Sequence, residues 1–105
     1  MNINDKIKDL IEKNKVCLFM KGTPNVPQCG FSLAVANILK HLNVKFESVN
    51  VLENEEIRDG IKSYSDWPTI PQLYILGKFI GGSDIVKEMF EKGKLKTLLE
   101  KELLI

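Results

Sequence analysis

Cysteine and histidine are both scarce in this sequence. Two cysteines, Cys17 and Cys29, cannot build the disulfide framework of a small secreted scaffold, so we expect a chain kept in a reducing compartment. The single histidine, His41, stands a full helix away from Cys29 in the predicted order of elements, which gives no support to a histidine-based metal site or a Cys/His nucleophile pair. We therefore expect His41 at the surface.

Charge of one sign and long apolar runs are missing as well. The 15 basic and 14 acidic residues give a formal charge of +1, which provides no cationic field for nucleic acid or an anionic membrane. No apolar run approaches the roughly 20 residues that span a bilayer, and the first residues contain no apolar signal core. We expect an unexported protein, cytoplasmic in a bacterial-type cell or in an organelle matrix after removal of a targeting peptide.

The spacing of apolar residues predicts alternating helices and strands within one domain over residues 1–105, since 44% of the residues are hydrophobic. A strand, a helix and a second strand in succession indicate a parallel crossover unit, and a later pair of strands an antiparallel hairpin. The predicted elements are a helix from an Asn4 cap to about residue 13, a strand over 16–20, a helix over 30–41, a strand over 44–51, a helix from an Asn54 cap to about residue 64, strands over 72–76 and 79–80 around a Gly77-Lys78 turn, and helices over 83–91 and 95–103.

Residues 21–32 carry the strongest chemical signal. They follow an apolar strand, form a loop with two prolines, and place Cys29 at the start of a predicted helix. Helix-start N–H groups and a nearby lysine favour a thiolate, and such cysteines titrate at roughly 3.5 to 7.5 rather than near 8.5. We predict that Cys29 is reactive and interpret Ser32, where a Cys-x-x-Cys motif has its second sulfur, as a helix cap. Cys17 lies inside the apolar strand and is assigned a structural role.

Three residues near this segment have both an ordinary and a functional interpretation. Phe31 is either a core aromatic residue or a shield that keeps water from the Cys29 sulfur. Lys21 is either a solvated lysine or a group that binds a carboxylate or stabilises the thiolate. Arg58, on its spacing alone, predicts only an exposed charge.

Two segments further along the chain have the features of binding loops. Residues 81–84 are either a glycine-rich turn with Ser83 or Asp84 as the helix cap, or a site where free backbone amides bind an anion and Asp84 binds an amine. A cis bond between Ile70 and Pro71 would leave the backbone of Ile70 free to pair with an extended peptide.

Separate motifs in the right order over nearly the whole chain resemble the monothiol glutaredoxins with a Cys-Gly-Phe-Ser active site. This family has the thioredoxin-like fold. The motifs lie at residues 20–24, 27–32, 57–58, 67–73 and 81–85. The resemblance implies an α/β protein with a four-stranded mixed sheet flanked by helices.

The resemblance also implies a role for individual residues. Cys29 would be the catalytic thiol and the protein ligand of an iron–sulfur cluster. Lys21 and Arg58 would bind the glycine carboxylate of glutathione, and Ile70 would pair with the tripeptide backbone. The other residues of the implied glutathione site are Phe31, Thr69, Gly82, and, at the γ-glutamyl end, Ser83 and Asp84.

The implied function is iron–sulfur cluster assembly and transfer. A homodimer would bridge a [2Fe–2S] cluster with Cys29 of each chain and one glutathione thiolate per chain, and would pass the cluster to acceptor proteins, with BolA-like proteins as further partners. A cluster needs four thiolates, so a chain with one accessible cysteine obtains the rest from outside. Many relatives have a second cysteine at the position of Ser83, and a disulfide from that position to Cys29 is excluded here.

The alternative function is that of a glutathione-dependent thiol–disulfide oxidoreductase. The Cys29 thiolate would attack a glutathionylated protein, and a second glutathione would resolve the mixed disulfide. Ser32 permits this monothiol route. A thioredoxin-like adaptor without chemistry is a third interpretation, which leaves an exposed cysteine unexplained.

Overall fold

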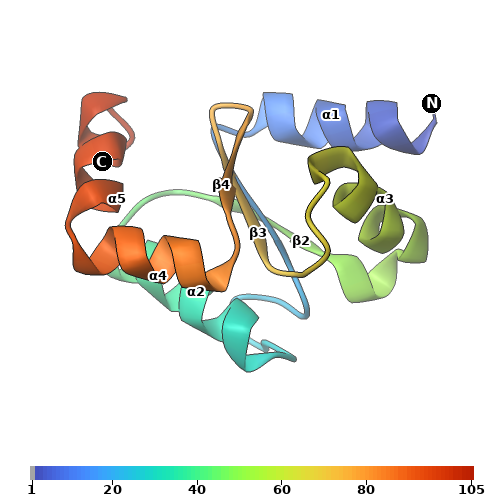
Figure 1. The fold of residues 1–105 in the computed structure, drawn as a ribbon, viewed down its shortest axis with the longest axis horizontal. Coiled ribbons are helices and arrows are strands. Elements are labelled where there is room, and N and C mark those ends of the chain that lie inside the picture. The colour runs from blue at the N-terminus through green and yellow to red at the C-terminus, as the bar shows by residue number, and fades with distance from the viewer. Residues whose placement is uncertain (1) are drawn as a thin grey trace.

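A four-stranded mixed sheet forms the centre of the structure, a computed structural model that describes residues 2–105 (Figure 1). The spatial order of the strands is β2-β1-β3-β4. Strand β1 pairs in parallel with β2 and antiparallel with β3, and β3 and β4 form an antiparallel hairpin. The strands are β1 (Val16–Met20), β2 (Glu47–Asn50), β3 (Gln72–Ile75) and β4 (Lys78–Gly81). The predicted crossover unit, hairpin and mixed sheet are confirmed.

Helices cover both faces of this sheet. Helices α1 (Ile3–Lys13) and α3 (Glu55–Ser65) pack on one face, and α2 (Gly30–His41), α4 (Ser83–Glu91) and α5 (Lys94–Lys101) lie on the other (Figure 1). A short 3₁₀ helix, η1 (Val51–Glu53), connects β2 to α3. The predicted order of helices and strands is confirmed, with η1 as an addition.

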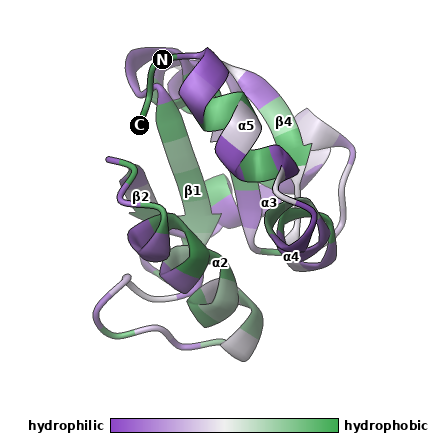
Figure 2. Ribbon diagram, turned by 90° about the vertical axis from the view of Figure 1, so that its left-hand side faces the viewer, coloured by the Kyte–Doolittle hydropathy of each residue, from purple (hydrophilic) through white to green (hydrophobic). Residues whose placement is uncertain are grey.

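Strand β1 supplies side chains to two separate cores because successive side chains of a strand point to opposite faces. Val16, Leu18 and Met20 pack with α2, α4 and α5, whereas Cys17 and Phe19 pack with α1 and α3. All five are at most 1% exposed, and Figure 2 shows the strand as a hydrophobic band. Burying a large apolar side chain stabilises the fold by roughly 1.5–3 kcal/mol, so β1 is the strand on which both layers depend.

Two predicted helix caps are wrong by one or two residues. The cap of α1 is Asn2, whose side chain accepts a hydrogen bond from the Asp5 amide at 2.9 Å, and Asn4 lies inside the helix. The cap of α4 is Gly82, and Ser83 is the first helical residue. In both cases neighbouring residues have suitable cap chemistry, so only the backbone geometry decides between them.

Other predicted ends also differ from the structure. Strand β2 is shorter than the predicted strand over 44–51, since Asn50 accepts a hydrogen bond from the Leu52 amide at 3.0 Å and turns the chain into η1. The hairpin turn consists of Leu76 and Gly77, with φ of 50° and 78°, as a tight two-residue turn requires. Helix α5 ends at Lys101 rather than at residue 103.

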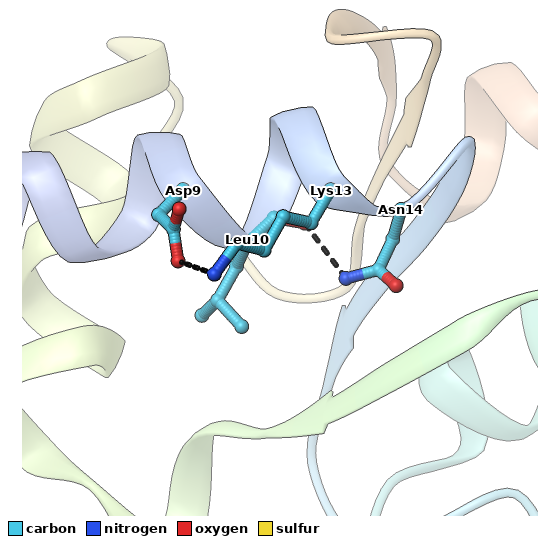
Figure 3. A network of polar contacts seen from close by, with 4 residues as sticks. All are labelled: Asp9, Leu10, Lys13 and Asn14. Atoms are coloured by element: carbon cyan, nitrogen blue, oxygen red, sulfur yellow. Dashed lines mark hydrogen bonds and ion pairs between the residues drawn. The ribbon is translucent and has the colours of Figure 1, made fainter.

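The C-terminal turn of α1 is closed by side chains (Figure 3). The Asn14 amide donates a hydrogen bond to the Leu10 carbonyl at 2.9 Å, and Lys13 pairs with Asp9 at 2.9 Å. A helix end leaves its last carbonyl groups without intrahelical partners, so the Asn14 contact satisfies one of them. Helix α1 therefore stops directly before β1.

Gly60 sets the distance between α1 and α3. A Cβ atom at this position would lie 2.9 Å from Ile7 Cδ1 and 3.0 Å from Ile3 Cγ1. We predict that Gly60→Leu lowers the free energy of unfolding by about 2 kcal/mol, because the added side chain overpacks this contact. Urea denaturation measures the effect. Gly60→Ala is the control and is expected to cost much less than Gly60→Leu, since its better helix propensity, about 1 kcal/mol, offsets part of the shift that Ile7 Cδ1 and Ile3 Cγ1 must make.

Candidate functional site

A cavity of about 490 Å³ opens where four parts of the chain meet. These parts are the residue after β1, the start of α2, the last turn of α3 with the loop that follows it, and the start of α4. The lining residues are Lys21, Cys29, Phe31, Lys62, Trp67, Pro68, Thr69, Ile70, Pro71, Gly82, Ser83, Asp84 and Ile85. Most of the predicted site residues therefore share one cavity, although Lys21 and Asp84 are 63 residues apart in the sequence.

Cys29 is the N-cap residue of α2 and is partly exposed in this cavity. The backbone N–H of Ser32 lowers the pKa of the Cys29 thiol below its ordinary value, and the Phe31 N–H, the Ser32 hydroxyl and the charge of Lys21 act in the same direction against desolvation. The leading cause is thus the helix-start amide rather than the lysine. By contrast, burial and the charge of Glu47 raise the pKa of Cys17 to about 12.

Ser32 is fully buried and connects α2 to the end of β1. Its Oγ accepts a hydrogen bond from the Lys21 backbone N–H at 3.0 Å. The prediction that Ser32 caps the helix is wrong, because Cys29 occupies the cap position. Phe31 is 64% exposed, which excludes its interpretation as a core aromatic residue.

The loop between β1 and Cys29 is held by a set of short-range hydrogen bonds. Thr23 and Val26 exchange backbone hydrogen bonds at 3.2 and 3.1 Å, and the Gln28 N–H donates to the Lys21 carbonyl at 3.0 Å. Outside the loop, the Gly22 N–H donates to Asn50 Oδ1 at 3.0 Å. These contacts fix the path that brings Cys29 to the cavity.

The loop over 66–71 forms another wall of the cavity and contains a cis peptide bond between Ile70 and Pro71. Within residues 2–105, no hydrogen bond joins the backbone N–H or carbonyl of Ile70 to another residue. These two groups are therefore free for an extended ligand.

The cavity contains charges of both signs. Lys21 and Lys62 are cationic, while Asp84 lies in the first turn of α4. The cap of α4 is Gly82, and no side chain caps its first N–H groups, which leaves them available to an anion. Across the described part of the chain, no three histidine, cysteine or acidic side chains are grouped so that they could hold a metal ion.

Comparisons with known proteins agree with this geometry. A family model described as Glutaredoxin matches residues 16–80. The chain is 56% identical over 99 residues to the chloroplastic monothiol glutaredoxin-S14 of Arabidopsis thaliana, covering 94% of this chain and 57% of that protein. It is 54% identical over 95 residues to an uncharacterized monothiol glutaredoxin of Synechocystis, covering 90% of this chain and 89% of that protein. The chain belongs to the monothiol glutaredoxin family.

The glutaredoxin fold is also found in solved structures. The solution structure of reduced poplar apo GrxS14 matches with a TM-score of 0.83 and 52% identity, over 96% of this chain and 93% of that chain. No helix among residues 2–105 is long and apolar enough to cross a membrane. The thioredoxin-like fold of this monothiol glutaredoxin is therefore shown by both sequence and structure.

Sequence reasoning did not assign five of the lining residues to the site and included Arg58, which lies outside the cavity; the five are Lys62, Trp67, Pro68, Pro71 and Ile85. Lys62 lines the cavity, whereas Arg58, half-buried one helical turn earlier on α3, does not. Gln72 lies inside β3, and its amide bonds to the loop over 66–71. The i, i+4 spacing of Arg58 and Lys62 could have pointed to Lys62. His41 is exposed, as predicted, and lines a different cavity with Phe90.

The two thiols of this monothiol glutaredoxin are expected to react very differently with iodoacetamide. Because the pKa of Cys29 is lowered, its thiolate prevails at a lower pH than that of an ordinary thiol, and the alkylation rate is expected to reach half its plateau below about pH 8.5, where an ordinary cysteine does. Cys17, with a pKa of about 12 and no exposure, is expected to react only after unfolding. Mass spectrometry across a pH series counts the modifications. Two modifications in the folded protein at neutral pH, or a midpoint at or above about pH 8.5, would contradict this.

Proposed function

We propose that this monothiol glutaredoxin binds glutathione in the cavity beside Cys29, and that a homodimer carries a [2Fe–2S] cluster and delivers it to acceptor proteins. One observation supports this most directly: Cys29, with its lowered pKa, faces a cavity that also has cationic groups, free backbone groups and an uncapped helix start. BolA-like proteins are proposed as further partners.

Glutathione is a tripeptide with a carboxylate at its glycine end and both an amine and a carboxylate at its γ-glutamyl end. Lys21 and Lys62 suit the glycine carboxylate, and the free backbone groups of Ile70 suit the central peptide. The α4 start suits the second carboxylate, and Asp84 suits the amine. Phe31, Thr69, Gly82 and Ser83, which line the same cavity, are proposed as further contacts.

The cysteines present fit a shared cluster rather than one held within a single chain. A [2Fe–2S] cluster takes four thiolate ligands. Cys29 is partly exposed, whereas Cys17 is buried with a pKa of about 12, so each chain supplies one thiolate. Two chains and two bound glutathione molecules complete the set. Because half of these ligands are small molecules that dissociate, the cluster is cargo suited to transfer.

Anaerobic incubation with iron, sulfide and glutathione tests the proposal. Visible absorption of a cluster and a dimer on gel filtration are both expected when glutathione is present, and neither when it is left out. Wild-type protein that stays a colourless monomer with glutathione would refute the carrier function. The release of the cluster to an apo-ferredoxin, followed by absorption, then tests transfer.

A second candidate function rests on the lowered pKa of Cys29. The Cys29 thiolate would attack the glutathione sulfur of a glutathionylated protein, which releases the protein thiolate and forms a Cys29–glutathione disulfide. A second glutathione thiolate would attack that disulfide, which yields oxidised glutathione and restores Cys29. High activity in a glutathione-coupled disulfide reduction assay, together with no cluster, would favour this function over the carrier.

Lys62 and Arg58 are expected to differ in their effect on glutathione binding. Lys62→Gln removes a cation from the cavity wall, so we expect glutathione to bind roughly tenfold more weakly, the loss typical of one charge-assisted hydrogen bond. The proposed role of Arg58 is tested by Arg58→Gln, for which we expect a change below about threefold, because Arg58 does not line the cavity. Isothermal titration calorimetry measures both. A larger loss for Arg58→Gln would show that the carboxylate binds further along α3 than the cavity indicates.

A further inference from the structure

The Gln72 side chain is a buried amide whose polar atoms all have partners. It is 0% exposed in β3. Its Nε2 donates to the Trp67 carbonyl at 3.0 Å and to the Thr69 carbonyl at 3.2 Å, and its Oε1 accepts from the Tyr74 hydroxyl at 3.1 Å. The two N–H donors of a glutamine amide are both on Nε2, so the side chain can bind two carbonyl groups only when Nε2, and not Oε1, faces the loop. The Tyr74 hydroxyl donates to the other end of the amide, Oε1, and so satisfies its acceptor.

Besides the packing of Ile70 in the core and of Trp67 against Phe79, the loop over 66–71 has few other hydrogen bonds. Its first part is tied to α3, since the Trp67 N–H donates to Ser65 Oγ and to the Lys62 carbonyl, both at 3.1 Å. Between residues 68 and 70, the only hydrogen bond that the described chain shows is the one from Gln72 to Thr69. The prolines at 68 and 71 have no N–H group to contribute. The middle of the loop therefore receives its hydrogen bond from the side chain of Gln72 in the neighbouring strand β3.

The Trp67 indole provides a second, independent observation. Its Nε1 is buried and is without an acceptor among residues 2–105. Buried donors without partners are rare and costly, so the indole contributes no polar anchor of its own to this loop. Apart from the backbone N–H groups of its first part, the loop is held through two of its carbonyl groups, and Gln72 binds both of them.

We propose that Gln72 is a positioning residue for glutathione: its buried amide holds the loop over 66–71 in the conformation that presents the backbone of Ile70 to the tripeptide. This inference rests on the proposed glutathione binding. Gln72 does not line the cavity and acts only through the carbonyls of Trp67 and Thr69. A loop without these two hydrogen bonds would have to be ordered when glutathione binds, and this entropic cost would weaken the affinity for glutathione.

Gln72→Met tests the proposal, with Tyr74→Phe as the matched control. Gln72→Met keeps the approximate volume of the side chain but removes both donors to the loop. Tyr74→Phe removes the third hydrogen bond of the same amide and leaves both loop contacts in place. We expect the dissociation constant for glutathione, measured by calorimetry, to rise about tenfold in Gln72→Met and less than about threefold in Tyr74→Phe. Thermal unfolding of both variants shows whether stability alone explains the difference.

A second variant and a second measurement separate positioning from general stability. Gln72→Glu keeps the acceptor for Tyr74, and its carboxyl group can donate to one loop carbonyl only when protonated. Its affinity relative to wild type is therefore expected to recover partly as the pH is lowered from about 8 to about 5.5. Trp67, the single tryptophan, reports on the loop itself, and acrylamide is expected to quench its emission more strongly in Gln72→Met.

The outcomes are distinct for the two proposals. If wild type does not bind glutathione, the proposed function is refuted. If wild type binds glutathione and both Gln72 variants bind within about threefold of it, the positioning role is refuted while the proposed function stands. If Tyr74→Phe weakens binding as much as Gln72→Met, the effect belongs to the core around Tyr74, and the positioning role is likewise refuted.

Discussion

Cys29→Ser is expected to abolish cluster assembly completely. Each chain offers one accessible thiolate, so the variant dimer would lose two of the four ligands that a [2Fe–2S] cluster needs. A serine hydroxyl in the same place stays protonated at neutral pH, even with the Ser32 and Phe31 amides that favour the thiolate of Cys29. After anaerobic incubation with iron, sulfide and glutathione, the variant should show no visible absorption and elute as a monomer.

Cys17→Ala is the matched control for this experiment. Cys17 is buried between the sheet and the helices α1 and α3, so its removal leaves the cavity unchanged. It should lower the free energy of unfolding by about 1 kcal/mol, the effect of removing one small buried side chain, and retain the full visible spectrum. A coloured Cys29→Ser protein, or a colourless Cys17→Ala protein, would show that the cluster ligand has been assigned to the wrong residue.

The parts of the fold that could be predicted from the sequence are those with a strong local signal. The run of apolar residues over 16–20 predicts a strand buried on both faces, and the structure places it between two cores. Asn54 precedes two acidic residues, and its side chain accepts from the Ile57 N–H at 3.1 Å, as the predicted cap requires. Capping and periodicity depend on residues within one or two turns, so a single sequence contains the information.

The parts of the site that could not be predicted depend on contacts between distant segments. Gln72 looks like one more strand residue, because only the folded chain brings the Trp67 and Thr69 carbonyls to its amide. Ser32 looks like a helix cap, because the Lys21 N–H that it binds is 11 residues away and comes from another element. The role of such a polar side chain depends on its hydrogen-bond partners in the folded chain, and its neighbours in the sequence do not reveal them.

Contacts with distant segments also hold the loop before Cys29. Besides the Ser32 contact, Asn50 accepts from the Gly22 N–H at 3.0 Å, and Lys40 donates to the Pro24 carbonyl at 2.9 Å. The Asn50 side chain also accepts from the Leu52 N–H, so it joins the end of β2 to the end of β1. Position and reactivity of Cys29 thus depend on the parallel pairing of two strands, not only on the helix that it caps.

Gly22→Ala is expected to have the largest effect on stability. The φ of Gly22 is +88°, and a Cβ atom would lie 2.5 Å from the Val26 carbonyl oxygen and 2.7 Å from the Gln28 nitrogen. Both contacts are with backbone atoms, so no side-chain rotation relieves them, and the loop has to open. We expect the free energy of unfolding to fall by about 3 kcal/mol or more, as the sum of an unfavourable left-handed φ and overpacking. Urea denaturation at neutral pH measures it.

Gly77→Ala separates the two causes, because Gly77 has a similar φ of +78° but a Cβ atom added there would have no neighbouring atom within 4 Å. For Gly77→Ala, the free energy of unfolding should fall only by the cost of the left-handed φ, about 1 kcal/mol. The difference between the two losses of stability is then the steric cost at Gly22. Only Gly22→Ala should also change the alkylation profile of Cys29, since Gln28 directly precedes Cys29 and its N–H pairs with Lys21. Equal losses in both variants, with Cys29 unaffected, would mean that the loop accommodates a side chain at Gly22 and does not fix the thiol.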